Sequence, residues 1–226
     1  MLRERNGNEV ISEFMRYLAR NPQAEAQGLP ALTEMSRELG VSVASLREQL
    51  EVARALGLVD VRPRLGIRRL PYSFRPAVRQ SLTYALTLDE SQFEHYSGLR
   101  NHIETAYWDE AVQKLTEEDK RELRAMISRA HGKLKRTPIQ VPHEEHRNLH
   151  LLIYRRLENP FVMGLLEAYW DAYEAVGLNV FAGGYEYLQE VWKYHETMVE
   201  SICNGDYKAG REALVQHIEL IYQRPA

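Results

Sequence analysis

The stretch LPALTEMSRELGVSVASLREQLEVARALGLVDVRPRLGIRRL, residues 29–70, decides the fold of the N-terminal part of the chain. Its apolar residues recur at helical spacing from about 31 to 39 and again from 43 to about 56. Gly40 can end the first helix, and Ser42 can cap the second by accepting a backbone N–H of its first turn. Two short helices joined by a tight glycine-containing turn predict a helix-turn-helix.

A basic β-hairpin is expected directly after these helices. In residues 57–70, Leu58, Val59 and Val61 alternate with polar residues, the chain turns at 63–66, and apolar residues resume at Ile67. The arginines at or just beyond the tip are Arg62, Arg64, Arg68 and Arg69. A helix-turn-helix followed by such a hairpin is a winged helix. The alternative is a small structural hairpin whose arginines are solvated.

Helical periodicity covers most of the remaining chain. One helix is expected at 9–19, and Asn21-Pro22 should end it with a break that continues through QAEAQG (23–28). Beyond Pro71 we expect helices near 74–86, 89–113, 117–135, 142–157, 160–176, 184–204 and 207–222. The sequence therefore predicts a mainly α protein, with a winged helix-turn-helix domain at 1–72 and an all-helical bundle of six or seven helices at 73–226.

Residues 29–70 resemble the DNA-binding domain of the GntR family of bacterial transcription regulators. The residues that match the family pattern are Leu29, Pro30, Glu34, 39–42, Arg47, Glu48, Leu50, 57–59, Arg62, Pro63 and Gly66. Thr33 and Val43 stand where the family usually has arginine. Because arginine reads guanine and clamps phosphate, these two replacements should change the operator sequence or weaken binding.

The resemblance implies that the helix at 43–56 enters a major groove of double-stranded DNA while the wing engages backbone or minor groove. The expected DNA-contacting residues are Ser42, Val43, Ser45, Arg47, Arg62, Arg64, Arg68 and Arg69. One such module makes few phosphate contacts, so we expect a homodimer on a two-fold symmetric operator. Residues 1–75 carry 12 arginines, no lysine and 9 acidic residues, a net charge of +3 in a chain of net charge −3. This charge is compatible with a segment facing phosphate, although a solvated face is the default interpretation.

Histidines gather in HEEHRNLH (143–150), where His146 and His150 are four residues apart and share one face of a helix. His195 and His217 each lie within an apolar helical face far downstream. Four converging imidazoles could bind a metal ion. Taken singly, each is more often a buried histidine satisfied by a hydrogen bond.

Residues 92–222 resemble the FCD domain, the helical effector-binding domain of FadR-type GntR regulators. The matching elements are 146–150, Asn159, His195, 202–209 and His217. The resemblance implies a divalent metal bound by His150, His195 and His217, with His146 in the place of the family's aspartate. A four-histidine site lacks one negative charge, which favours zinc or nickel over manganese and leaves the ion more electropositive toward an anionic effector. The alternative that His146 turns away and water replaces it stays open.

Arg100, in GLRNHIE, matches a family arginine that faces the effector cavity, and a guanidinium is suited to a carboxylate. The alternative for Arg100 is an ion pair with Glu104 on its own helix. We expect His143 to be a solvated residue at a helix N-terminus. The aromatic residues expected mainly in the bundle core, with one or two lining the pocket, are Tyr107, Trp108, Tyr169, Trp170, Tyr173, Trp192 and Tyr194.

Several classes of protein are disfavoured. The single cysteine, Cys203, excludes an intramolecular disulfide, and the chain has neither a charged-then-apolar leader nor an apolar run near the ~18 residues of a membrane span, so we expect a cytoplasmic protein. A metal-dependent hydrolase fits poorly, because Arg147 stands between His146 and His150 where a general-base glutamate would be needed. We therefore predict a regulator rather than an enzyme, controlled by an organic acid bound at the metal. The remaining alternative is a metal-independent regulator in which the histidines satisfy one another.

Overall fold

The computed structural model describes residues 11–63, 66–177 and 184–222. Contacts divide the chain into two compact units, Met1–Gln80 and Ser81–Ala226. The division falls within helix α6 (Arg75–Leu88), somewhat later than the boundary at 72 expected from the sequence. Within the described residues, no helix combines the length and the apolar composition that a membrane span requires.

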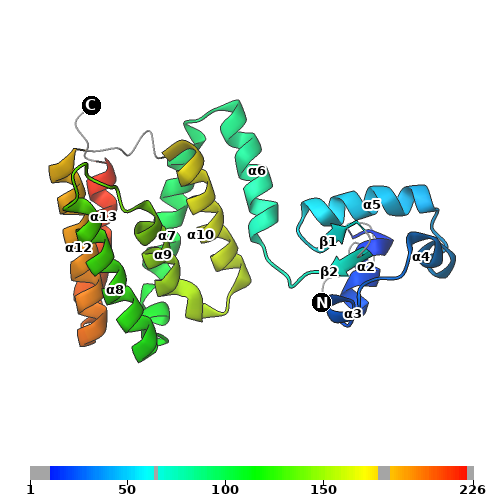
Figure 1. Ribbon diagram of the computed structural model, residues 1–226, viewed down its shortest axis with the longest axis horizontal. Helices are drawn as coiled ribbons and strands as arrows, with labels where there is room; N and C mark the ends of the chain where they lie inside the picture. The colour runs from blue at the N-terminus through cyan, green and yellow to red at the C-terminus, as the bar shows by residue number, and fades with distance from the viewer. Residues whose placement is uncertain (1–10, 64–65, 178–183, 223–226) are drawn as a thin grey trace. The chain divides into compact units, whose positions relative to one another are not determined.

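The N-terminal unit is a winged helix-turn-helix, as predicted (Figure 1). Its elements are α2 (Glu13–Arg20), α3 (Ala24–Gln27), α4 (Leu32–Leu39), α5 (Val43–Ala55), β1 (Val59–Arg62) and β2 (Gly66–Arg69). Gly40 ends α4 in the left-handed conformation at φ 67°, and the Ser42 Oγ caps α5 by accepting the Ser45 N–H at 3.2 Å. Strands β1 and β2 pair antiparallel, with Val59 opposite Arg69 and Arg62 opposite Gly66.

A compact core holds this unit together. The buried residues that form it are Phe14, Leu18, Met35, Leu46, Leu50, Ala53 and Val59. The Phe14 N–H donates to the Gln49 Oε1 at 2.9 Å and thereby ties α2 to α5. Since this core sits behind α5, the opposite face of that helix is left on the surface.

The expected break at 23–28 is partly wrong, because it contains the short helix α3. Ala24 is buried, and Gly28, at φ 80°, ends the helix with its N–H bonded to the Ala24 carbonyl. A helix of four residues is too short to show a helical period in the sequence. The polar composition of this stretch therefore predicted a loop.

The C-terminal unit is an all-helical bundle, and the predicted fold class is confirmed. Besides α6, it contains α7 (Gln92–Gln113), α8 (Glu117–Leu134), α9 (His143–Tyr154), α10 (Pro160–Ala172), α12 (Tyr185–Asn204) and α13 (Tyr207–Tyr222). A 3-10 turn (Arg155–Leu157) follows α9, and a π turn (Tyr173–Gly177) follows α10. Helix α12 packs along α8 and α13, while α9 contacts α7, α8 and α10 (Figure 1). Helices α9 and α12 thus both pack against α8, and α13 packs against α12 and α7.

Hydrogen bonds of two buried side chains fix the helices around the site. The fully buried Asp119 near the start of α8 accepts hydrogen bonds from the Thr116 N–H at 2.9 Å and the Arg156 Nε at 2.9 Å, and it also pairs with Arg155. This fixes the end of α9 against α8. The Trp108 Nε1 of α7 donates to the Tyr207 carbonyl at 2.8 Å and fixes the start of α13.

Candidate metal centre and effector cavity

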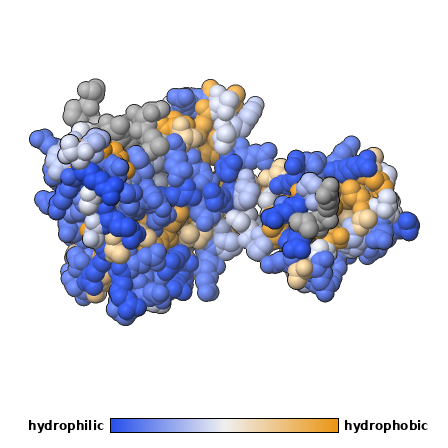
Figure 2. Space-filling view, viewed as in Figure 1, coloured by the Kyte–Doolittle hydropathy of each residue, from blue (hydrophilic) through white to orange (hydrophobic). Residues whose placement is uncertain are grey.

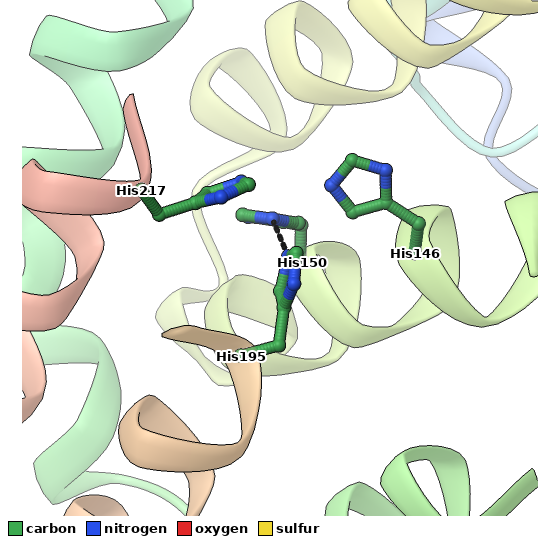
Figure 3. A group of neighbouring side chains, drawn as sticks. All are labelled: His146, His150, His195 and His217. Carbon is green, nitrogen blue, oxygen red and sulfur yellow. Dashed lines mark hydrogen bonds between the residues drawn. The ribbon is translucent and has the colours of Figure 1, made fainter. Parts of the chain in front are cut away.

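Four histidines from three helices meet inside the bundle. Helix α9 supplies His146 and His150, α12 supplies His195 and α13 supplies His217, and their rings face one another (Figure 3). The nitrogen atoms that could bind a metal all lie within 4.8 Å of one another. The structure thus brings together the four histidines that the sequence singled out.

A directed chain of hydrogen bonds runs through His150 and His195. The Val191 carbonyl can only accept, so the His195 Nδ1–H donates to it at 2.8 Å and leaves the His195 Nε2 as an acceptor. The Arg100 Nη2 can only donate, so at 2.8 Å the His150 Nδ1 accepts from it. The proton of His150 then lies on Nε2, which donates to the His195 Nε2 at 3.1 Å. This chain satisfies both rings without an ion.

The other two histidines are not satisfied in this way. Both ring nitrogens of His217 and the Nε2 of His146 are buried and have no hydrogen-bond partner among the described residues. A buried polar atom without a partner costs about 1–3 kcal/mol. The His217 ring has its centroid 5.7 Å from that of His146 and 4.3 Å from that of His195, so these unsatisfied nitrogens lie within one small cluster.

One pair of the nitrogens has the spacing that two ligands of one divalent ion require, whereas the four together span up to 4.8 Å and would draw closer around an ion. Two nitrogen ligands, each about 2.1 Å from one ion, lie about 3.0–3.4 Å apart in octahedral or tetrahedral coordination. The 3.1 Å between the His150 Nε2 and the His195 Nε2 falls in this range. The donor set and the unsatisfied atoms of His146 and His217 therefore fit the metal that the sequence implied.

An ion pair from α7 supports the cluster from one side. Arg100 is 2 % exposed, and its Nη2 lies 2.9 Å from the Glu104 Oε2. The Glu104 Oε2 also lies 3.2 Å from the His150 Nδ1, but neither approach has hydrogen-bond geometry, so both Glu104 oxygens are buried without a hydrogen bond. The ion pair considered as the alternative for Arg100 is therefore present. A contact between Arg100 and an effector stays a prediction.

Burial sets the protonation of the cluster. It lowers the pKa values of His146, His195 and His217 well below the usual range, and the neighbouring imidazoles and Arg100 lower them further. Burial also lowers the pKa of His150, although the Glu104 carboxylate opposes this effect. Burial would raise the pKa of Glu104, but the positive charge of Arg100 beside it outweighs burial and the pKa is lowered. Neutral imidazoles beside an ionised carboxylate are the form in which histidine binds metals.

A cavity of about 30 Å³ adjoins the cluster. It is lined by Val141, Pro142, His143, His146, Tyr169, Tyr173, Tyr187, Leu188, Val191, Trp192 and His217. His143 is partly buried in this wall and not the solvated residue expected. Sequence reasoning missed Tyr187, although Tyr187, Val191 and His195 follow one another at the four-residue spacing of one helical face.

The expected aromatic residues divide between core and cavity. Trp108 and Trp170 are buried in the core, and Tyr107 and Tyr194 are partly buried. Tyr169, Tyr173 and Trp192 line the cavity, which is more than the one or two expected. The cavity wall is therefore largely aromatic on the side of α10 and α12.

The expected DNA-contacting residues lie on α5 and the wing. Ser42, Arg47, Arg62 and Arg68 are exposed, Val43, Ser45 and Arg69 are partly buried, and Arg64 lies outside the described residues. The Ser42 Oγ serves as the cap of α5, and the Arg62 Nε donates to the Asp60 Oδ2 at 2.6 Å. Arg47 and Arg68 make no hydrogen bond or ion pair within the part of the chain that the structure describes. These two arginines are therefore exposed and have no partner within the described residues.

Known proteins resemble the chain in sequence pattern and in fold. The family model of the FCD domain matches residues 97–220, whereas no curated protein matches the chain. Streptococcus agalactiae GntR has a similar solved structure, with 14% sequence identity, 92% of this chain and 98% of that chain covered, and a TM-score of 0.68. E. coli McbR/YncC has 17% identity, 93% and 96% coverage, and a TM-score of 0.51. The chain therefore belongs to the FCD domain family, and it has the fold of the GntR-family regulators.

Proposed function

We propose that this protein is a DNA-binding transcription regulator whose operator affinity is controlled by a small organic acid at a divalent metal ion. One observation carries the proposal: four imidazoles, three of them fully buried and two with unsatisfied nitrogens, meet beside a cavity of the FCD domain. The same chain has a winged helix with exposed arginines.

The ligands proposed for the ion are His150, His195 and His217, with His146 as the fourth. Four neutral imidazoles leave the full positive charge of a divalent ion, which would attract a carboxylate. Imidazole ligands favour zinc or nickel over manganese. Arg100 lies against His150 on the side of α7, and although Glu104 offsets part of its charge, attraction of an anionic effector is the role we propose for it.

DNA binding is assigned to α5 and the wing of the N-terminal unit. The residues proposed are Ser42, Val43, Ser45, Arg47, Arg62, Arg64, Arg68 and Arg69. We further propose that two copies bind a two-fold symmetric operator, because one module makes few phosphate contacts. Apolar surface gathers over α6 of the helical unit (Figure 2), where Tyr84 is 68 % and Leu88 70 % exposed, and this surface is suited to a second copy.

Control would follow from a difference in effector affinity between two arrangements of the dimer. A coupling free energy of about 1–3 kcal/mol changes operator affinity about 5- to 150-fold. A hydrolase is a poorer interpretation, since Arg147 is paired with Asp171 and Glu174 and the buried Glu104 is in ionic contact with Arg100. Neither side chain is available to activate a water molecule.

The competing proposal is a metal-independent regulator. The hydrogen-bond chain from Arg100 through His150 and His195 to the Val191 carbonyl favours it, because that chain is complete without an ion. The unsatisfied nitrogens of His217 favour the metal. Zinc content of the purified full-length protein separates the two, and absence of stoichiometric metal would leave only the competing proposal.

The test of the whole proposal is operator binding by the full-length protein. An operator is first selected from random duplex DNA, and its affinity is then measured with and without zinc and with and without a carboxylic acid. We expect Arg68→Ala to weaken binding and to lower the salt dependence by about one counterion, because one phosphate contact is lost. Arg129→Ala, an exposed arginine of α8, is the matched control. Failure to select any duplex, or an operator affinity indifferent to every bound ligand, would contradict the proposal.

A further inference from the structure

The walls of the effector cavity carry no aspartate, glutamate, lysine or arginine among the described residues. Aliphatic side chains, including Val141, Leu188 and Val191, and aromatic rings, including Tyr173 and Trp192, form most of the lining. The side chains that titrate near neutral pH are imidazoles, and burial keeps those of the cluster neutral. The cavity is therefore an apolar chamber in contact with the histidine cluster.

The unsatisfied polar atoms of the cavity wall belong to the histidine cluster, whereas the other polar groups of the wall are His143 and the hydroxyls of Tyr169, Tyr173 and Tyr187. His146 and His217 belong to both the cavity wall and the cluster, and each has a buried nitrogen without a hydrogen-bond partner among the described residues. A ligand bound here would place its charged group at these histidines and its remaining atoms against the apolar wall.

The nearby arginine does not provide a second anchor. Arg100 does not line the cavity and is 2 % exposed, and its guanidinium is in contact with the Glu104 carboxylate. Its charge acts on the cluster from behind the Tyr169 ring, whose centroid lies 4.9 Å from the Arg100 Cζ. A second carboxylate of a ligand would be buried against apolar side chains without a cationic partner, and such burial is strongly unfavourable.

The size of the cavity restricts the ligand further. A volume of about 30 Å³ holds on the order of two water molecules, so the body of the ligand must be compact unless side chains move. Hydroxyl groups along that body would lose their hydrogen bonds to water against Val141, Leu188 and Val191. The chamber thus disfavours sugar acids as well as acids with several carboxylates.

We infer that the effector is a small monocarboxylate with an apolar body, and not a di- or tricarboxylate or a polyhydroxylated acid. This inference rests on the proposed function and specifies the ligand class of the same site. The carboxylate would bind at His146 and His217 of the cavity wall. The apolar body would contact the Val141, Val191 and Trp192 walls.

Butyrate and succinate test the inference as a matched pair, because succinate is butyrate with its terminal methyl replaced by a carboxylate. Binding of each acid to the zinc-loaded full-length protein is measured by calorimetry, with gluconate as the polyhydroxylated probe. We expect butyrate to bind at least ~10-fold more tightly than succinate or gluconate, as burial of one unpaired charged group requires. Benzoate and terephthalate repeat the comparison with a larger apolar body.

A positive charge placed in the cavity wall should reduce or remove the preference for butyrate over succinate. Val141 lines the cavity and is 38 % exposed, so Val141→Arg can be accommodated without burying its guanidinium. We expect this variant to bind succinate at least ~10-fold more tightly than the wild type does, because the second carboxylate gains a partner. Ile139→Arg adds the same charge to the same segment at a residue that is 44 % exposed and does not line the cavity, and it should leave the preference unchanged.

The possible outcomes separate this inference from the proposed function. Binding of succinate or gluconate as tight as that of butyrate would overturn the inference and leave control by a metal-bound acid standing. Equal effects of Val141→Arg and Ile139→Arg would also overturn it, since the wall would not decide specificity. A zinc-loaded protein that binds none of these acids would overturn both the inference and acid control. Zinc content and operator binding test the remainder of the proposed function separately.

Discussion

The Nε2 atoms of His150 and His195 lie 3.1 Å apart, although their helices are separated by the whole of α10 in the chain. This distance suits two ligands of one ion. We predict that His150→Ala and His217→Ala each reduce bound zinc from about one per chain to below a tenth of that after dialysis, because each loses a ligand. Elemental analysis and cobalt absorption spectra check this. His95→Ala, an exposed histidine of α7, should retain the metal, and equal retention by all three variants would contradict the assignment.

Glu104 should control the affinity of the cluster for metal. The hydrogen-bond chain requires the His150 Nε2 to carry a proton, so ligation requires this proton to move to Nδ1 and the ring to turn from the Arg100 Nη2 toward the Glu104 Oε2, which is 3.2 Å away. Loss of such a carboxylate partner typically costs 10- to 100-fold in metal affinity. We predict a loss of about that size in Glu104→Gln by competition with a zinc chelator. Glu200→Gln, at an exposed glutamate of α12, is the control, and identical affinities of the two variants would exclude this role.

The sequence predicted the elements better than the contacts between them. The spacing of His146 and His150 and the caps at Gly40 and Ser42 are local, and local patterns sufficed for the helix-turn-helix and for one face of α9. The approach of Glu104 to the His150 Nδ1 depends on how α7 packs against α9, which no periodicity reports. A helical period shows which residues share a face, but it does not show which face lies opposite.

Two other residues of the cavity show what helical periodicity can and cannot predict. Tyr187 could have been found from its four-residue spacing to Val191 and His195. His143 could not, because an acidic first turn made the start of α9 resemble a solvated helix end, and burial there comes from the packing of the bundle. Spacing alone could not show that His150, His195 and His217 meet. That expectation came from the resemblance to the FCD domain.

Asp119 should make the stability of the helical unit depend on pH. Burial would raise its pKa, but hydrogen bonds from Arg156, the Thr116 N–H and Arg155 outweigh burial and hold the pKa below the usual value of 3.8. A depressed carboxyl pKa stabilises the folded state above the unfolded pKa, and this stabilisation is lost as the pH falls through the folded pKa. We predict that Asp119→Asn lowers the free energy of unfolding by about 1–3 kcal/mol at pH 7, with a smaller difference from the wild type near pH 2.

Urea unfolding at both pH values measures this difference. Asp109→Asn is the control, because the Asp109 side chain is 60 % exposed and its nearest cation, the Arg211 Nη1, is 4.0 Å away. A pH-independent difference between Asp119→Asn and the wild type would show that the hydrogen bonds, and not the charge, stabilise this junction.

Gly210 should not tolerate a methyl group. A Cβ at this position would lie 2.8 Å from the Trp108 Cζ2 and 3.3 Å from the Ser201 Cβ, whereas a Cβ at Gly98 of α7 would meet no atom within 4 Å. We predict that Gly210→Ala destabilises the protein by about 1–3 kcal/mol through overpacking. Gly98→Ala should stabilise it by up to about 1 kcal/mol through helix propensity.

Thermal or urea unfolding distinguishes the two glycine variants. Since α13 carries His217, Gly210→Ala should also weaken zinc binding, while Gly98→Ala should leave it unchanged. Stabilisation by both substitutions would mean that α13 can shift away from Trp108 at no cost.

The helices that hold the four imidazoles enter the bundle at widely separated points of the chain. An ion shared by α9, α12 and α13 would therefore act as a removable cross-link, closing long loops that the unfolded chain leaves open. The lifetime of the folded protein would then follow the supply of free metal, so that starvation for the ion would expose the chain to proteases before any effector acted. The same bound metal ion would then serve both effector binding and protection of the chain from proteolysis.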